Sequence, residues 1–201
     1  MKKIEQVYRE MLFQAIENKK RSLTQSEMTL KLGFSLSTVN LAVKKLERIG
    51  AIIINTRSFK IVDIKKILLY WASLRGLDKD IIYETRIDIN VREIEKSLPD
   101  VFYACFSAYK FKFKDVPADY SEVYVYALEE QIDGIKKRFP EKKGIPNLFV
   151  LKTDENMRQY EKTITIAQIF VDLWNLKQWY AKDFLDSFEK KLNNLLDGKN
   201  E

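Results

Sequence analysis

The sequence contains no histidine and only one cysteine, Cys105, among its 201 residues. Zinc frameworks built from cysteine and histidine ligands cannot be assembled from this composition. General acid–base and triad chemistry that depends on histidine is excluded as well. Any catalysis would rely on carboxylates, lysine or tyrosine, and we expect Cys105, inside the apolar run 101–106, to be a buried thiol.

Glycine and proline are also scarce, with six and four residues. Neither a phosphate-binding loop nor a dinucleotide-binding glycine fingerprint is present. No apolar run reaches the length of a membrane span, and no signal-peptide pattern opens the sequence. We therefore expect a cytoplasmic protein without membrane contact. Hydrophobic residues make up 46% of the chain, which is enough to form a core.

The charge is distributed unevenly along the chain. The formal net charge is +6, but residues 1–75 contain 15 lysine and arginine residues against 6 aspartate and glutamate residues, a balance of +9. The remaining residues carry −3. This asymmetry predicts two domains, of which only the first faces a polyanion. We place the first domain at 1–76, with 63–76 as a connecting helix, and the second at 77–201.

The first 33 residues have the pattern of two helices. Apolar residues recur at helical spacing over 2–19. Thr24, followed three residues later by Glu27, is a capping-box pattern and predicts the start of a short helix. Gly33 is expected to end that helix, because glycine tolerates the positive φ of a helix C-terminus.

A third helix is expected from Ser35 to Gly50, followed by a hairpin of two short strands at 51–55 and 58–62. One helix face is apolar; the other carries small hydroxyl and amide groups near its start and cations further along. Hydroxyl and amide groups can read base edges, and cations can contact phosphates. Each single cation could equally be an ordinary surface charge in contact with solvent. The predicted DNA-binding set is Ser35, Ser37, Thr38, Asn40, Leu41, Lys44, Lys45, Arg48, Arg57 and Lys60.

This outline resembles the winged helix-turn-helix of bacterial and archaeal transcription regulators. The resemblance rests on LTQSEMTLKLGFSLSTVNLAVKKLERIGAII, in which Gly33, Ser35, Thr38-Val39, Leu46-Glu47 and Gly50 match the family pattern. It implies a helix in the major groove of double-stranded DNA and a wing on the DNA backbone. Winged helices also serve as protein-interaction modules, so that alternative stays open.

From residue 77 onward, strand and helix patterns alternate. Strands are predicted at 81–89, 101–106, 122–128 and 148–152, and helices at 90–99, 129–139, 165–174 and after Asn175. Residues 107–113 fit a short helix or a strand. Asn90 with Glu93 and Thr165 with Gln168 have the pattern of capping boxes. Trp174, Trp179 and Tyr180 are interpreted as core residues, with a partner-binding patch as the alternative.

The C-terminal region resembles the end of the AbiEi-type antitoxin family, the transcriptional regulators of type IV toxin–antitoxin systems. The resemblance rests on GIPNLFVLKTDE and TITIAQIFVDLWNLKQWYAKDFLDSFEKKL, with Asp154 after a strand, Gln168 and Asp172 on one helix and Ala181 and Leu185 on the next. These proteins pair a winged helix-turn-helix with a domain related to nucleotidyltransferases. The implied fold class is α+β with two domains, the second an α/β nucleotidyltransferase-like domain with C-terminal helices.

A working nucleotidyltransferase would show a Gly-Ser turn and two aspartates spaced D-x-D for Mg²⁺. The corresponding residues here are Phe106-Ser107-Ala108, without the glycine, and the strand VYVYALEE, with Glu129-Glu130 only at its end. The resemblance therefore implies a degenerate domain with no catalytic residue, metal or cofactor.

The sequence as a whole predicts a DNA-binding transcriptional regulator, an antitoxin-like repressor of its own operon. The expected partners are double-stranded DNA and, through residues 77–201, a toxin, another protein or a second copy of the chain. A nucleotidyltransferase-related enzyme with an attached DNA-binding domain and a ligand-sensing regulator are the alternatives.

Overall fold

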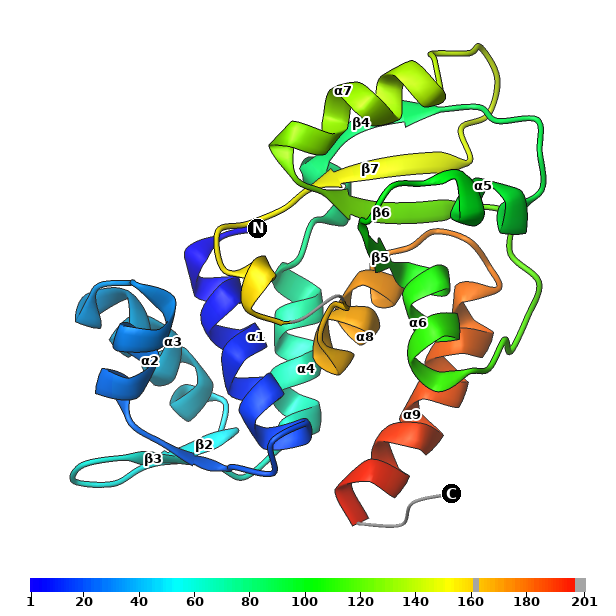
Figure 1. Cartoon of the computed structure of the whole chain (residues 1–201). Coiled ribbons are helices and arrows are strands. Elements are labelled where there is room, and N and C mark those ends of the chain that lie inside the picture. Colours follow the sequence, from blue (N-terminus) through cyan, green and yellow to red (C-terminus); the bar gives the residue numbers. More distant parts are fainter. Residues whose placement is uncertain (161–162, 198–201) are drawn as a thin grey trace.

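Helix α1 (Lys3–Ile16) lies among the other helices in the computed structural model, which describes residues 1–160 and 163–197 (Figure 1). Its apolar residues recur at helical spacing, and most of them are fully buried, Val7, Met11 and Leu12 among them. Four polar residues of the same helix are buried as well: Glu5, Gln6, Arg9 and Glu10. The helix packs against α2, α3, α4 and α8, so it has few positions that face solvent.

The next elements are β1 (Ser22–Leu23), α2 (Gln25–Leu32), α3 (Leu36–Arg48), β2 (Ile52–Ile54) and β3 (Phe59–Ile61). Both helices and the hairpin lie where the sequence predicted them. Thr24 and Glu27 form the expected reciprocal capping box, and Gly33 ends α2 with φ of 68°. The three strands form an antiparallel sheet in the order β1-β3-β2. Strand β1 was not predicted, because two residues are too few for a period-2 pattern.

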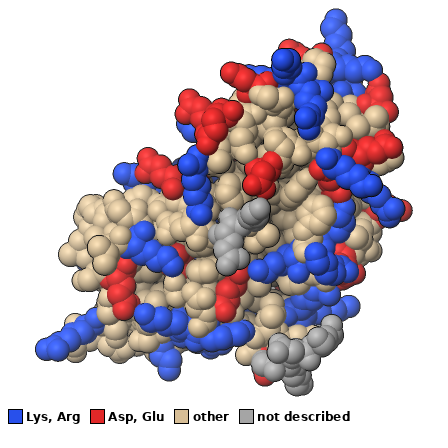
Figure 2. Space-filling model, in the orientation of Figure 1, with Lys and Arg blue, Asp and Glu red and all other residues tan. Residues whose placement is uncertain are grey.

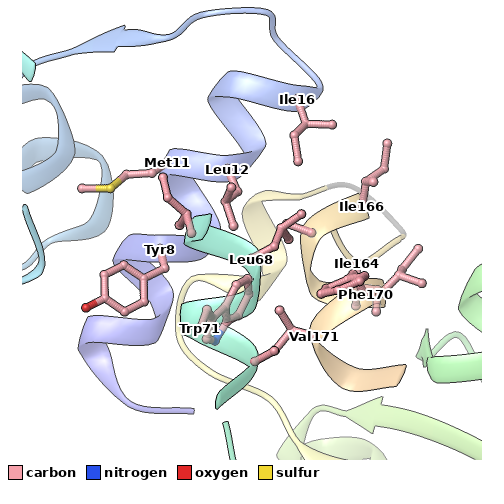
Figure 3. Packing of buried hydrophobic residues seen from close by; sticks show 14 of the residues in the cluster. Tyr8, Met11, Leu12, Ile16, Leu68, Trp71, Ile164, Ile166, Phe170 and Val171 are labelled. Atoms are coloured by element: carbon pink, nitrogen blue, oxygen red, sulfur yellow. The ribbon is translucent and has the colours of Figure 1, made fainter. Parts of the chain in front are cut away.

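Helix α4 (Ile64–Leu74) begins after Asp63, whose side chain accepts a hydrogen bond from the Lys66 backbone N–H at 2.9 Å. The predicted connecting helix packs on α1 and α8 (Figure 3). The larger buried cluster extends from Val7 to Leu192, across position 76. The division at residue 76 therefore does not separate two independent cores, and the division into two domains stays a prediction.

A second sheet contains β4 (Ile81–Thr85), β5 (Phe102–Ala104), β6 (Val123–Ala127) and β7 (Leu148–Lys152) in the order β4-β7-β6-β5. Strands β6 and β7 are parallel, and the other neighbours are antiparallel. Every residue of β6 is buried, as expected for a strand covered on both faces.

Different helices cover the two faces of this sheet. Val123 and Val125 belong to a small cluster with residues of α5 (Val91–Ser97) and α7 (Glu129–Arg138). Tyr124 and Tyr126 belong to the larger cluster, with α6 (Cys105–Phe113), α8 (Ile166–Trp174) and α9 (Ala181–Asp197). The chain is thus an α+β protein, as the sequence predicted.

The prediction of a strand over 101–106 is wrong at its end. Strand β5 stops at Ala104, and Cys105 begins α6 with φ of 51°, which turns the chain sharply. Residues 107–113 are therefore helical. Cys105 is fully buried, as expected, and burial raises the pKa of its thiol.

The prediction that Trp174 and Trp179 are core residues is wrong. Trp174 is 48% exposed and Trp179 is 81% exposed, because Trp179 lies in the connection between α8 and α9. Tyr180 is half-buried and donates a hydrogen bond to Glu122. Among the residues that the structure describes, no helix is long and apolar enough to cross a membrane.

Candidate nucleic-acid interface

Helix α3 is held on the protein by one apolar stripe. Val39, Ala42, Val43 and Leu46 are fully buried, and the helix packs against α1 and α2. Their spacing places them on one face, so the opposite side of the helix is left at the surface. Ile49, which follows the last residue of the helix, is only half-buried.

At the start of α3, the hydroxyl group of Ser35 contacts two others. The Ser35 side chain caps the helix by accepting from the Thr38 backbone N–H at 3.3 Å. Its Oγ also lies 2.9 Å from Ser37 Oγ and 3.0 Å from Thr38 Oγ1. These contacts restrict the side-chain rotamers and use the hydrogen-bonding capacity of Ser35, whereas the hydroxyls of Ser37 and Thr38 each retain capacity for a further hydrogen bond. The structure thus brings together three of the predicted residues.

Asn40 lies one turn further along α3 and is held by a residue of α2. Its Nδ2 donates a hydrogen bond to Oε1 of Gln25 at 3.1 Å. Both side chains are half-buried. Gln25 was not among the predicted site residues, since a polar residue in the first turn of a helix carries no specific signal.

Two exposed leucines flank these polar groups. Leu41, a predicted site residue, is 52% exposed, and Leu36, which was not predicted, is 57% exposed. Apolar side chains at a nucleic-acid interface contact the thymine methyl group. Because isolated exposed leucines are common on protein surfaces, they add to the site only through their place beside Ser37 and Asn40.

The cations of α3 follow toward its C-terminal end. Lys44 and Arg48 are exposed, and Lys45 is half-buried. Within the described ranges, none of the three forms an ion pair. Leu41, Lys44, Lys45 and Arg48 are spaced at i, i+3, i+4 and i+7, which places them on one side of the helix.

The remaining two predicted residues lie on the hairpin. The Asn55 backbone N–H donates to the Ser58 carbonyl at 2.8 Å and closes the turn that exposes Arg57. Lys60 lies in the central strand β3, opposite Ile53 and Ser22, and is exposed. Lysine and arginine side chains gather over this hairpin at the lower left of Figure 2. No hydrogen bond joins these two residues to the α3 set among the described residues.

Three of the residues that carry the second resemblance, Asp154, Gln168 and Asp172, lie in a buried junction. Asp154 accepts two hydrogen bonds from Arg9, at 2.6 and 2.8 Å, and Gln168 Oε1 accepts a third from Arg9 at 3.2 Å. The predicted capping box at Thr165 is therefore only half formed, because the Gln168 side chain points to Arg9 instead. At Asn90, only the bond from the Glu93 backbone N–H to the Asn90 side chain is formed.

Asp172 occupies a second buried position in the same junction. It accepts from Arg75 Nε at 3.4 Å and from the Tyr126 hydroxyl at 2.7 Å. Burial raises the pKa of Asp172 to about 6, against the opposing effect of the Arg75 charge. Gln168 and Asp172 therefore join α8 to α1 and to the end of α4, and Asp154 joins the segment after β7 to α1.

The segment after β7 also reaches α2. Asn156 Nδ2 donates to the Leu32 carbonyl at 3.2 Å and to Gln6 Oε1 at 2.9 Å. Leu32 is the last residue of α2, directly before Gly33. The turn between α2 and α3 is therefore tied to the region that follows the second sheet.

An open hollow of about 650 Å³ lies beside this segment, at the carboxyl ends of β6 and β7. Its charged lining is mixed, with Glu129, Glu130, Asp154, Glu155, Lys136, Lys152 and Arg158. Ligands of α/β proteins commonly bind at the carboxyl ends of parallel strands. No group of three or more aspartate, glutamate or cysteine residues could hold a metal ion within the described part of the chain.

Comparisons with protein-family models, with curated proteins and with solved structures found no match to this chain. The two family resemblances therefore stay predictions from the residues quoted above.

Proposed function

We propose that the chain is a sequence-specific, DNA-binding transcriptional regulator of the winged helix-turn-helix class. In this proposal, α3 enters the major groove of double-stranded DNA, and the β2–β3 hairpin is the wing on the backbone. The observation that supports it best is the order of groups along the exposed side of α3. Hydrogen-bonding side chains occupy its first half, and its second half carries cations that form no ion pair with any residue that the structure describes.

The dimensions of α3 suit this arrangement. The helix has 13 residues and is therefore about 20 Å long. The major groove is about 12 Å wide, so Ser37 and Asn40 can face base edges while Lys44 and Arg48 reach flanking phosphates. The positive balance of residues 1–75 supplies the long-range attraction.

The proposed biological role is that of an antitoxin-like repressor of its own operon, which acts in the cytoplasm without catalysis of its own. The residue patterns quoted for the AbiEi-type family support this role. In the proposal, residues 77–201 bind a toxin, another protein or a second copy of the chain. A first check is whether the purified chain protects its own promoter from nuclease digestion.

DNA binding is tested by selection from a random pool of duplexes. The full chain should enrich a defined sequence, and the enriched duplex should compete at least about tenfold better than a scrambled duplex. Enrichment of no sequence, or equal competition by the scrambled duplex, would refute sequence-specific binding.

The hollow at the carboxyl ends of β6 and β7 supports a second candidate function, a regulator that senses a small ligand. Asp154 lines this hollow and also bonds Arg9 of α1, so an occupant would act on the helical part of the molecule. A thermal-shift screen with nucleotides and metabolites tests this candidate. Arg158→Ala, on the rim of the hollow, should abolish any shift that is observed.

A further inference from the structure

The hydrogen bond between Asn40 and Gln25 has a consequence for how Asn40 presents its amide. An asparagine side chain offers two N–H donors and one carbonyl acceptor. Gln25 turns its Oε1 toward Asn40, and because this oxygen only accepts, the Nδ2 end of Asn40 faces α2 in this arrangement. The Oδ1 end of Asn40 therefore points away from Gln25.

The bond uses one of the two N–H groups of Asn40. One N–H donor and the carbonyl oxygen are left, and this is the pair that bonds N7 and N6 of adenine in the major groove. Without Gln25, the amide could turn about its last side-chain torsion, which has broad and roughly two-fold minima. A turned amide would exchange donor for acceptor and would lose the match to adenine.

We propose that Gln25 is a positioning residue, which holds the Asn40 amide in the orientation that reads adenine. The inference rests on the proposed function, because it assumes that α3 faces base edges. Gln25 is the first residue of α2, and Asn40 is in the second turn of α3, so the bond also ties the two helices at the DNA-facing side.

The experiment uses the full chain and the duplex that wild-type protein selects from a random pool. Each base pair of that duplex is substituted in turn, and the loss of affinity is measured for wild type and Asn40→Ala. The A·T pair whose discrimination disappears in Asn40→Ala is the pair that Asn40 reads. A bidentate amide–adenine contact discriminates about 5- to 150-fold.

Gln25→Met keeps the length of the side chain and removes the acceptor. At that one base pair, the ratio of affinities for the selected and substituted duplexes should fall to within about twofold of the ratio measured for Asn40→Ala. The ratios at the other base pairs should stay unchanged. Adding Gln25→Met to Asn40→Ala should cause no further loss. Gln25→Glu keeps an acceptor, so it should retain the discrimination while binding every duplex more weakly through its negative charge.

Ser26→Ala is the matched control, because Ser26 is the next residue of α2 and is exposed. It should leave discrimination unchanged, and circular dichroism should show the same melting temperature for all variants within a few degrees. Full discrimination in Gln25→Met, or equal losses on all duplexes, would overturn the positioning role and leave the proposed function intact. Wild-type protein that selects no sequence would overturn both.

Discussion

Replacing Lys44 and Lys45 with alanine removes two cations from the second half of α3. If these side chains contact phosphates, each contact releases condensed counterions when the complex forms. The logarithm of affinity then falls with the logarithm of salt concentration, with a slope of about −0.9 per contact on duplex DNA. The double variant should therefore show a salt slope that is shallower by nearly two.

The structure sets the limits of this change. Lys44 is exposed and Lys45 is half-buried, and neither forms an ion pair within the described residues. A half-buried lysine still extends its ammonium group to the surface, so both can reach a phosphate. Between 50 and 200 mM salt, wild-type affinity should thus fall about 12-fold more than that of the double variant.

Fluorescence anisotropy with a labelled duplex at four salt concentrations gives the slope. The matched control is Lys137→Ala/Lys143→Ala, which removes the same charge from exposed positions in and after α7. That control should shift the slope by less than about 0.5. Equal slopes for wild type and the Lys44→Ala/Lys45→Ala variant would refute the placement of this half of α3 on the DNA backbone.

Three further results are expected from the buried parts of the molecule. Arg9→Met should lower the free energy of unfolding by about 3–5 kcal/mol in urea titrations, because it leaves the Asp154 carboxylate buried without its partner. Adding Asp154→Asn should recover part of that loss, and a single-variant loss below about 1 kcal/mol would contradict the buried pair. Gly33→Ala should lower the free energy of unfolding by about 1 kcal/mol. The cause would be the φ of 68° alone, since no atom lies within 4 Å of the added Cβ. An unchanged urea midpoint would contradict this expectation. Folding raises the pKa of Asp172 to about 6, so the folded state binds the proton of this carboxyl group more tightly than the unfolded state does. The group therefore stabilises the folded state at low pH, and this contribution is lost as the pH rises through about 6. Lowering the pH from 7 to 5 should therefore add about 1 kcal/mol from this group in wild type and nothing from it in Asp172→Asn.

Local rules explain why α2 and α3 were predictable. The capping box of Thr24 and Glu27, the positive φ of Gly33 and the cap at Ser35 all join residues within a few positions of one another. Such signals can be read along the chain. At Thr165 the same rule predicted the helix start correctly, but the Gln168 side chain bonds Arg9, 159 positions away, in place of its own helix start.

The parts that could not be predicted depend on contacts between distant segments. Gln25 became a site residue only because α2 packs on α3 and brings it to Asn40. Trp179 has the size of a core residue, yet its position in the connection between α8 and α9 leaves it exposed. Charge counts predicted a basic N-terminal part, but they could not show which cations lack ion pairs.

The buried junction also changes how the two predicted domains relate to each other. Arg9 binds Asp154 and Gln168, Arg75 binds Asp172, and Asn156 binds the carbonyl of Leu32. Desolvated charges of this kind are stable only while every partner stays in place. The segment 153–160 therefore cannot move without breaking its bonds to α1 or displacing the end of α2. Because Gly33 and the start of α3 follow directly, we propose that an occupant of the hollow beside this segment acts on the orientation of α3 through these bonds.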